Sequence, residues 1–182
     1  MDDARPLVVE AARRGDRDAR AALLRELQDV WYRFCLGLLR DADAAREATQ
    51  ETAVRFLARL SEFRGDSRLK TWSLGIALNV VREMRRARRP EPTDPALLAA
   101  ADPRNAADAP DGAVIVAEQA RLLRAVLDDL PDRQREAVVL RFFEDLSVEE
   151  TAKAMRCAQG TVKATVHQAM RALRERLNAV GL

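Results

Sequence analysis

Residues 82–89 read REMRRARR and place five arginines within eight positions, against a single acid. Guanidinium groups donate hydrogen bonds in a fork that matches the oxygens of phosphate, and clustered positive charge attracts polyanions. Basic side chains also stabilise the carboxyl end of a helix, but that role would rarely need so many. The cluster therefore predicts a phosphate-binding surface.

Residues 61–68, before the helix that carries this cluster, read SEFRGDSR and predict a loop with a small polar pocket. Gly65 allows a positive φ angle, and Arg64, Asp66 and Ser67 can offer hydrogen bonds beside exposed backbone amides. An alternative interpretation is that Asp66 and Ser67 only cap the helix that is expected to begin near Leu69.

A second candidate site lies in residues 147–177. Ser147 and Glu150 have the spacing of a capping box, which marks the start of a short helix. After the four residues RCAQ, apolar side chains at steps of three or four predict a second, longer helix. Its stripe consists of Val162, Val166, Ala169, Leu173 and Leu177. Two helices joined in this way are typical of a helix-turn-helix, whose second helix usually enters the DNA major groove.

The side of that second helix away from the stripe is small and polar, with Gly160, Thr161, Lys163, Ala164, His167, Gln168 and Arg171. The small members would let the backbone approach a groove, and the polar members can bond to base edges or reach phosphate. The alternative is an ordinary amphipathic helix pair in a bundle, which would show the same periodicity.

Two positions in this stretch break local rules. The turn places Arg156 where a left-handed residue is expected, at a cost of about 1–2 kcal/mol. Ala158 is expected to be the N-cap of the second helix, which forgoes about 1 kcal/mol of capping. We therefore expect apolar contacts to hold this module together.

The elements that position both sites are all expected to be helices, because Ala, Leu and Arg are abundant and alternating β-branched runs are scarce. Helices are predicted at residues 6–39 with a break near Gly15 and Asp16, from Asp41 or Asp43 to about 60, and at 69–88, 113–130 and 131–144, with Pro131 at the first position of the last. The side chains predicted to face inward are Leu23, Leu27, Val30, Trp31, Phe34, Leu38, Ala45, Ala48, Thr52, Phe56, Leu60, Leu69, Trp72, Ile76, Val80, Met84, Ala137, Leu140 and Phe143.

Charge and composition divide the chain into a domain at 1–89, a linker at 90–112 and a domain at 113–182. These three segments carry net charges of +5, −4 and +1, and the linker holds five of the seven prolines. Proline, alanine and aspartate in this proportion predict an extended or disordered connection. The expected fold is therefore all-α, with two helical domains joined by a flexible acidic linker.

Several classes of function are disfavoured by the sequence. The chain has one histidine, His167, so a His-based metal cluster is excluded, and no catalytic constellation is visible. We expect no enzyme activity, no metal and no cofactor. Cys35 and Cys157 are expected to be buried reduced thiols. With no membrane-spanning apolar stretch and no signal-peptide pattern, the protein is expected to be cytoplasmic.

Taken together, the two modules resemble the sigma-70 family of RNA polymerase sigma factors, of the extracytoplasmic-function (ECF) type. FRGDSRLKTWSLGIALNVVREMRRARR is similar to regions 2.3 and 2.4 of that family. LPDRQREAVVLRFFEDLSVEETAKAMRCAQGTVKATVHQAMRALRERL is similar to region 4. The resemblance covers nearly the whole chain, and the order of the two modules around an acidic linker makes it specific.

The resemblance implies a dissociable initiation subunit that binds core polymerase through the β′ clamp helices and the β flap, opens the −10 element and reads the −35 element of promoter DNA. It assigns the −10 strand to Arg64, Gly65, Asp66, Ser67, Trp72, Asn79, Arg82, Arg85 and Arg86. It assigns the −35 element to Thr161, Lys163, Ala164, His167, Gln168 and Arg171, and core binding to Glu47, Gln50 and Glu51. It also implies that the linker threads toward the RNA exit channel, and that an anti-sigma factor is a common partner.

The sequence departs from the family pattern in two places. The recognition helix has Ala164, Thr165 and Gln168 where Ser and Arg are common, so −35 affinity would depend more on base contacts. Region 2.2 has Arg46 where the family usually has acids, which would weaken clamp-helix binding. Phosphorylation of Thr49 by a regulatory kinase would add negative charge there and could act as a switch. The simpler alternative is that nearby acids suffice and Thr49 is only a half-buried helix residue.

Two rival functions remain at this point. A helix-turn-helix regulator that does not replace sigma would explain residues 131–177, but not the FRGDSRLKTW segment, the arginine cluster or the linker. A sigma mimic that has lost DNA binding would not need Lys163, Arg171 or the arginines of residues 82–89.

Overall fold

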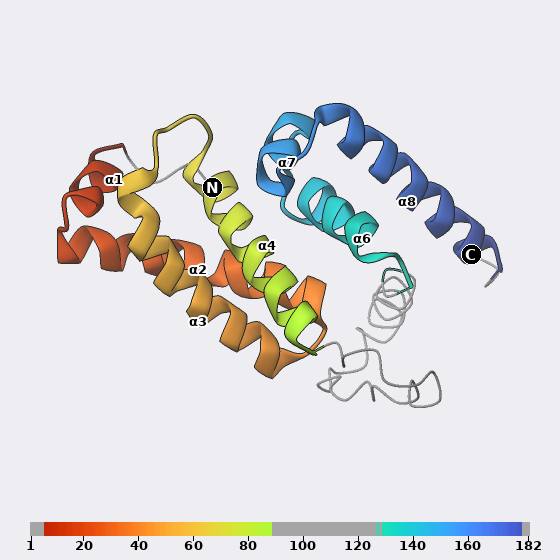
Figure 1. Cartoon of the computed structure of the whole chain (residues 1–182), viewed down its shortest axis with the longest axis horizontal. Helices are drawn as coiled ribbons and strands as arrows, with labels where there is room; N and C mark the ends of the chain where they lie inside the picture. Colours follow the sequence, from red (N-terminus) through yellow and green to blue (C-terminus); the bar gives the residue numbers. More distant parts are fainter. Residues whose placement is uncertain (1–5, 89–126, 128, 180–182) are drawn as a thin grey trace, which may run out of the picture.

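The computed structural model describes residues 6–88, 127 and 129–179, and the regular elements of this part of the chain are all helical (Figure 1). This confirms the all-α class for the described residues. The linker predicted at 90–112 lies outside them, as does most of the helix predicted at 113–130.

The N-terminal helices are α1 (Pro6–Arg13), α2 (Arg17–Leu39), α3 (Ala42–Arg59), the short 3-10 helix η1 (Leu60–Glu62) and α4 (Leu69–Arg88). The predicted break between the first two is confirmed. Gly15 has a φ of 101°, which glycine adopts without strain, and the Asp16 side chain caps α2 by accepting from the amide of Ala19 at 2.7 Å. Asp41, one of the two predicted starts, caps α3 in the same way.

Aromatic side chains hold α4 in place against the other N-terminal helices. Phe56 is fully buried, and its ring centroid lies 5.2 Å from that of Trp31 and 5.7 Å from that of Trp72. Trp72 also contacts Phe63, at 5.3 Å. The indole nitrogen of Trp31 donates to the hydroxyl of Ser73 at 3.0 Å, so this buried polar group is satisfied. These contacts set the position of α4 and of the loop that precedes it.

The C-terminal helices are α6 (Asp132–Val138), the π-helical turn η3 (Val139–Phe143), α7 (Val148–Met155) and α8 (Gln159–Ala179). The capping box is confirmed, because the Ser147 hydroxyl accepts from the Glu150 amide at 3.1 Å and the Glu150 carboxylate accepts from the Ser147 amide at 2.8 Å. Arg156 has a φ of 53°, as the turn predicted. The apolar stripe of α8 faces inward, with Val162, Ala169 and Leu173 buried.

Three local predictions need correction. Phe143 was expected to face inward but is 56% exposed, because the amide of Glu144 bonds to the carbonyl of Val139, five residues back. The extra residue in this π turn rotates the end of the helix and directs Phe143 outward. Pro131 is the N-cap of α6 rather than its first residue. Cys157 is a half-buried free thiol, whereas Cys35 is buried as predicted, and burial raises the pKa of the Cys35 thiol to about 12.

The C-terminal helices pack directly on the N-terminal ones, with α7 beside α4 (Figure 1). The contact is close because glycine faces it: a Cβ atom added at Gly75 would lie 3.6 Å from the Cα of Ala154. Gly37 of α2 meets Val139 in the same way, at 3.8 Å. Buried side chains of both helix groups therefore form one continuous core. A smaller apolar cluster joins α6 to α8.

Candidate nucleic-acid interface

The loop before α4 presents the residues that the sequence assigned to a polar pocket. Gly65 has a φ of 80°, which confirms the predicted use of glycine, and Asp66 is exposed. The first backbone hydrogen bond of α4 runs from the amide of Trp72 to the carbonyl of Arg68, at 3.0 Å. Because Arg68 holds the cap position, the alternative role of Asp66 and Ser67 as helix caps loses its geometric basis.

A small cavity of about 90 Å³ lies between this loop and the C-terminal helices. Its walls include Ser67, Trp72 and Gly75 from the N-terminal side, and Lys153 and Arg156 from the C-terminal side. The carbonyl oxygen of Asp66 accepts a hydrogen bond from the Lys153 ammonium at 2.9 Å. In this arrangement the loop is therefore partly covered by α7.

Helix α4 divides its candidate strand-binding residues between two faces. Trp72, Asn79 and Arg86 follow one another at intervals of seven residues, which is close to two helical turns, so they share a face. The first two are half-buried and Arg86 is exposed. Arg82, three residues after Asn79 and four before Arg86, lies at the edge of this face, and Arg85 lies further round the helix; both contact α6.

Both of these arginines meet carboxylates of α6. Nε and Nη2 of Arg82 donate to the two carboxylate oxygens of Glu136, at 3.1 and 2.6 Å. Arg85 lies 3.2 Å from the carboxylate of Asp132 and donates to the carbonyl of Leu38 at 2.6 Å. The side chain of Glu136 is only 2% exposed, so its carboxylate is largely removed from water, whereas that of Asp132 is 42% exposed. Arg82 and Arg85 are thus engaged by the protein itself in this arrangement.

The exposed face of α8 matches the prediction for a recognition helix. All six residues assigned to the −35 element are exposed: Thr161, Lys163, Ala164, His167, Gln168 and Arg171. Arg171 lies 3.7 Å from Glu175 on the same helix, a surface pair that binding could break at little cost. The geometry therefore leaves this face able to enter a groove.

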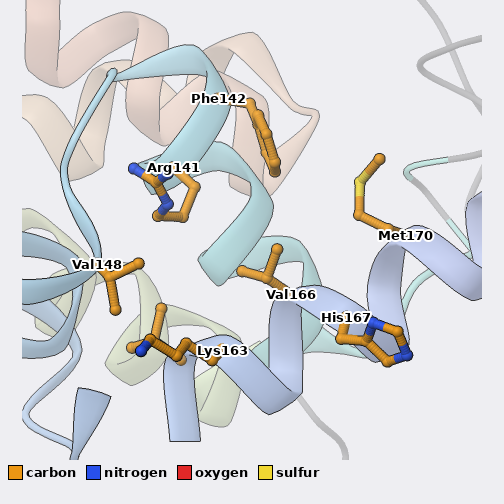
Figure 2. A pocket seen from close by; sticks show the side chains of 8 residues that line it. Arg141, Phe142, Val148, Lys163, Val166, His167 and Met170 are labelled. Atoms are coloured by element: carbon orange, nitrogen blue, oxygen red, sulfur yellow. The ribbon is translucent and has the colours of Figure 1, made fainter. Parts of the chain in front are cut away.

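An apolar depression of about 320 Å³ adjoins the same helix (Figure 2). Phe142 and Val148 line it from one side, and Val166 and Met170 of α8 from the other. Its rim includes Lys163 and His167. Phe142 is 54% exposed and Met170 41%, which is unusual for side chains of this size. Phe142 and Phe143 point outward because of the π turn. The spacing of apolar residues in the sequence does not predict this exposure.

The three residues assigned to core binding lie on α3, each facing solvent at least in part. Gln50 is exposed, and Glu47 lies 3.8 Å from Arg88 of α4. Glu51 accepts from Nε of Arg55 at 2.6 Å, and Arg55 also reaches Glu83, at 2.7 Å. The pKa of Arg55 is raised by its hydrogen bonds to these two carboxylates. The acids of this face are therefore matched by the protein's own cations.

Two further residues of α3 bear on the departure from the family pattern. Arg46 pairs with Asp43 on the same helix, so part of its positive charge is offset. Thr49 is half-buried, and its hydroxyl donates to the carbonyl of Ala45 at 2.7 Å. Thr52 makes the equivalent bond to Ala48 and is fully buried, as its place on the apolar stripe predicted.

Among the described residues, no group of histidine, cysteine and carboxylate side chains could hold a metal ion. None of the described helices is both long enough and apolar enough to cross a membrane.

The sequence did not identify the acids of the C-terminal helices as partners of the basic ones. Asp132, Glu136, Glu144 and Glu150 meet cations of α4 and its approach, and all four are visible in the sequence as charges in a near-neutral domain. The negative charge of these four residues, opposite to that of the α4 cations, was a signal that they could pair. Only the packing of α6 and α7 on α4 shows which acid meets which cation.

Comparison with known proteins adds an independent line of evidence. Residues 23–91 match the family model for sigma-70 region 2, and residues 120–173 match the model for sigma-70 region 4. The RNA polymerase sigma-H factor of Pseudomonas aeruginosa is 30% identical over 176 residues, which cover 91% of this chain and 90% of that protein. The ECF RNA polymerase sigma factor SigX of Bacillus subtilis is 31% identical over 155 residues, 82% of this chain and 78% of that one.

A solved structure shares the fold. The sigma factor RpoE in complex with the anti-sigma factor NepR, from Bartonella quintana, superposes with a TM-score of 0.65 and 24% identity. The match covers 87% of this chain and 96% of that chain.

Proposed function

The chain belongs to the sigma-70 family, in its ECF group, and is an RNA polymerase sigma factor for promoter-specific transcription initiation; from this premise we propose how its residues divide the work. Residues 1–89 are the region 2 domain, 90–112 the linker and 113–182 the region 4 domain. Region 2 captures the −10 strand, and region 4 reads the −35 element. One observation carries this proposal. The chain combines a basic helix that follows a polar loop with a recognition helix whose reading face is exposed.

Strand capture would use the loop and both faces of α4. A base that leaves the stack needs a pocket with hydrogen-bond partners, which Asp66 and Ser67 can supply, and an aromatic surface, which Trp72 can supply. Asn79 lies about two helical turns beyond Trp72 on the same face, and Arg86 about four turns beyond it. Arg82 and Arg85 would hold the phosphate backbone of the strand. Arg64 and Gly65 complete the loop. This chemistry requires no catalytic group and no cofactor.

Core polymerase would be bound at two places. The carboxylate face of α3, with Glu47, Gln50 and Glu51, suits the basic surface of the β′ clamp helices. The depression beside Phe142 and Met170 suits an apolar segment of the β flap, because large exposed apolar side chains mark interaction sites. We place the acidic linker toward the RNA exit channel and the whole protein in the cytoplasm, where the polymerase acts. An anti-sigma factor is a further proposed partner, since the RpoE relative is bound to one.

The direct test is run-off transcription with purified protein, core polymerase and a pool of genomic promoter fragments. Specific transcripts that depend on the added protein are expected. A helix-turn-helix regulator would give no transcript with core polymerase alone, and that outcome, at low salt and with Thr49 phosphorylation supplied, would reject the function.

Recognition of the −35 element should depend on Gln168 and Arg171. Replacing either by alanine is expected to weaken discrimination between matched and mismatched −35 sequences by about 1–3 kcal/mol, the range for a bidentate base contact. The measurement is competition binding by the holoenzyme to promoter variants. Arg174→Ala is the matched control, because Arg174 is exposed on α8 but lies beyond the predicted reading face. Equal losses for Arg171 and Arg174 would indicate general charge rather than base reading.

We further propose that phosphorylation of Thr49 strengthens core binding. A phosphate would add about −1.5 to −2 charges to the α3 face. The hydroxyl is half-buried and bonded to Ala45, so a kinase would have to draw it away from the helix surface. Thr49→Glu and Arg46→Glu should each tighten binding to core polymerase, and Thr49→Ala should not. Tight binding by the unmodified protein, without improvement by either acidic variant, would remove this switch and leave the sigma function unaffected.

A further inference from the structure

A network of three charged side chains joins α3 to α4 beside the face that we assign to core polymerase. Nε of Arg55 donates to the carboxylate of Glu51 at 2.6 Å, one turn earlier on α3. Nη1 of the same Arg55 lies 2.7 Å from the carboxylate of Glu83, which belongs to α4. The two helices contact each other in region 2 (Figure 1). One guanidinium therefore holds two carboxylates that come from different helices.

The network lies at the surface, where another molecule can reach it. The side chain of Arg55 is 35% exposed, and those of Glu51 and Glu83 are each 45% exposed. One cation between two acids leaves the network with a net charge of −1. An ionised carboxylate can accept about four hydrogen bonds, and Arg55 contacts one oxygen of each. Both acids therefore keep the capacity to accept from a cation of a partner.

The bridge depends on the shape of the arginine side chain as well as on its charge. A guanidinium is planar and directs its N–H donors in a fixed fork, so Nε and Nη1 of Arg55 can serve two acceptors at once. A lysine would bring the same charge as one compact group on a flexible stem. Hydrogen bonds to Glu51 and then to Glu83 raise the pKa of Arg55, so both carboxylates are coupled to the same cation.

Such a bridge changes what a partner meets when it binds. A glutamate side chain that moves freely in solution loses rotamer freedom when an interface immobilises it, and this loss opposes binding. Glu51 and Glu83 are held by Arg55 before any partner arrives. Less freedom is then lost on association, which is the advantage of a preorganised binding surface.

We propose that Arg55 is a positioning residue for core polymerase, and that the core-binding surface continues from α3 onto Glu83 of α4. In this role Arg55 presents Glu51 and Glu83 as an ordered pair to basic groups of the β′ clamp helices. The inference rests on the proposed role of the α3 face in core binding. It also reverses the effect expected from charge alone, because a cation on an acidic docking face would repel a basic partner, whereas Arg55 strengthens the contact.

The substitution Arg55→Lys separates position from charge, because it keeps the cation and removes the fork. The test is biolayer interferometry of the full-length protein with core polymerase. The dissociation constant should rise by about tenfold, as two side chains lose their order before binding. The loss should come from faster dissociation, because the association rate follows net charge, which does not change. An unchanged dissociation constant would overturn the positioning role.

The matched control is Arg59→Lys, one turn further along α3. The side chain of Arg59 is similarly exposed, and it pairs with Glu62, three residues away, rather than with α4. The same substitution there should change the dissociation constant by less than about twofold, as expected for an isolated surface pair. If Arg59→Lys weakened binding as much as Arg55→Lys, the effect would reflect a general loss of arginine and would contradict the proposal.

A merely structural role of Arg55 is tested in a protein that carries Glu51→Gln and Glu83→Gln. If Arg55 acts by presenting these two carboxylates, Arg55→Lys should have little further effect on core binding in that background. If Arg55 only stabilised the packing of α3 on α4, the lysine variant would weaken core binding by the same factor in both backgrounds, and the positioning role would be rejected.

The single variant Glu83→Gln tests the part of the surface that lies on α4. It removes one anchor of Arg55 and leaves α3 unchanged, so it also serves if Arg55→Lys fails to fold. We expect core binding to weaken by about fivefold, since one ordered charged contact is lost. Core binding equal to that of the parent protein would remove Glu83 from the surface and overturn the proposal.

Failure of the proposed function would give a different result. If the α3 face does not bind core polymerase, Glu51→Gln alone leaves the dissociation constant unchanged, and so does Arg55→Lys. If Glu51→Gln weakens binding and Arg55→Lys does not, core binding by α3 stands and the positioning role of Arg55 is overturned.

Discussion

Holoenzyme that carries Arg85→Ala together with Arg86→Ala is expected to bind promoters at the −35 element but to fail in opening the −10 element. Arg85 and Arg86 lie in the last turn of α4, and together they reach both faces of the helix end. A hydrogen bond to a charged group contributes about 1.5–3 kcal/mol, so loss of two should reduce the population of open complex by about a hundredfold or more. The salt dependence of opening should fall by a slope of about 1.4.

Permanganate footprinting of the −10 region measures this opening directly. The double variant Arg14→Ala and Arg17→Ala is the matched control, because both arginines are exposed where α1 leads into α2, outside α4, and the loss of charge is the same. The control should open the promoter normally. Normal opening by the Arg85 and Arg86 variant would contradict the assignment of α4 to the −10 strand.

Phe56→Ala should have the largest effect on stability. Phe56 is fully buried between Trp31 and Trp72, so alanine would leave a cavity that two large rings cannot fill without moving. Removal of a buried phenylalanine costs about 3–5 kcal/mol, which is a large share of the roughly 5–15 kcal/mol that stabilises a typical domain. The melting temperature should fall by many degrees, and Trp72 should lose its support beside the loop.

Thermal and urea unfolding measure the change. Val54→Ala, on the same helix but 63% exposed, is the control and should stay within about 0.5 kcal/mol of the parent protein. A loss below about 1 kcal/mol for Phe56→Ala would show that the ring stack is not what positions α4. A folded Phe56→Ala protein studied at low temperature should still bind −35 DNA, because α8 lies in the other region.

The sequence by itself determined the class of fold and most of the helix boundaries. The start of a helix depends on nearby residues. The side chains of Asp16, Asp41 and Ser147 each accept a hydrogen bond from the backbone amide three residues further on, so a short window of sequence is enough to predict these starts. The stripe on α3 is equally local, since a period of 3.6 places Ala48, Thr52 and Phe56 on one side whatever lies opposite. The recognition face of α8 was predictable for the same reason.

The tertiary structure alone decided what covers these surfaces. The exposure of Phe143 depends on a π turn that sequence periodicity does not encode, and the close approach at Gly75 depends on which helix crosses it. The arginine cluster was visible in the sequence as charge, but the sequence did not show which arginines face solvent and which pair within the protein. Arg86 faces solvent, while Arg82 is bound to Glu136, 54 residues away. Pairing over such a distance follows from the packing of α6 on α4, because charge complementarity specifies a partner only once the backbone has brought the two groups within reach.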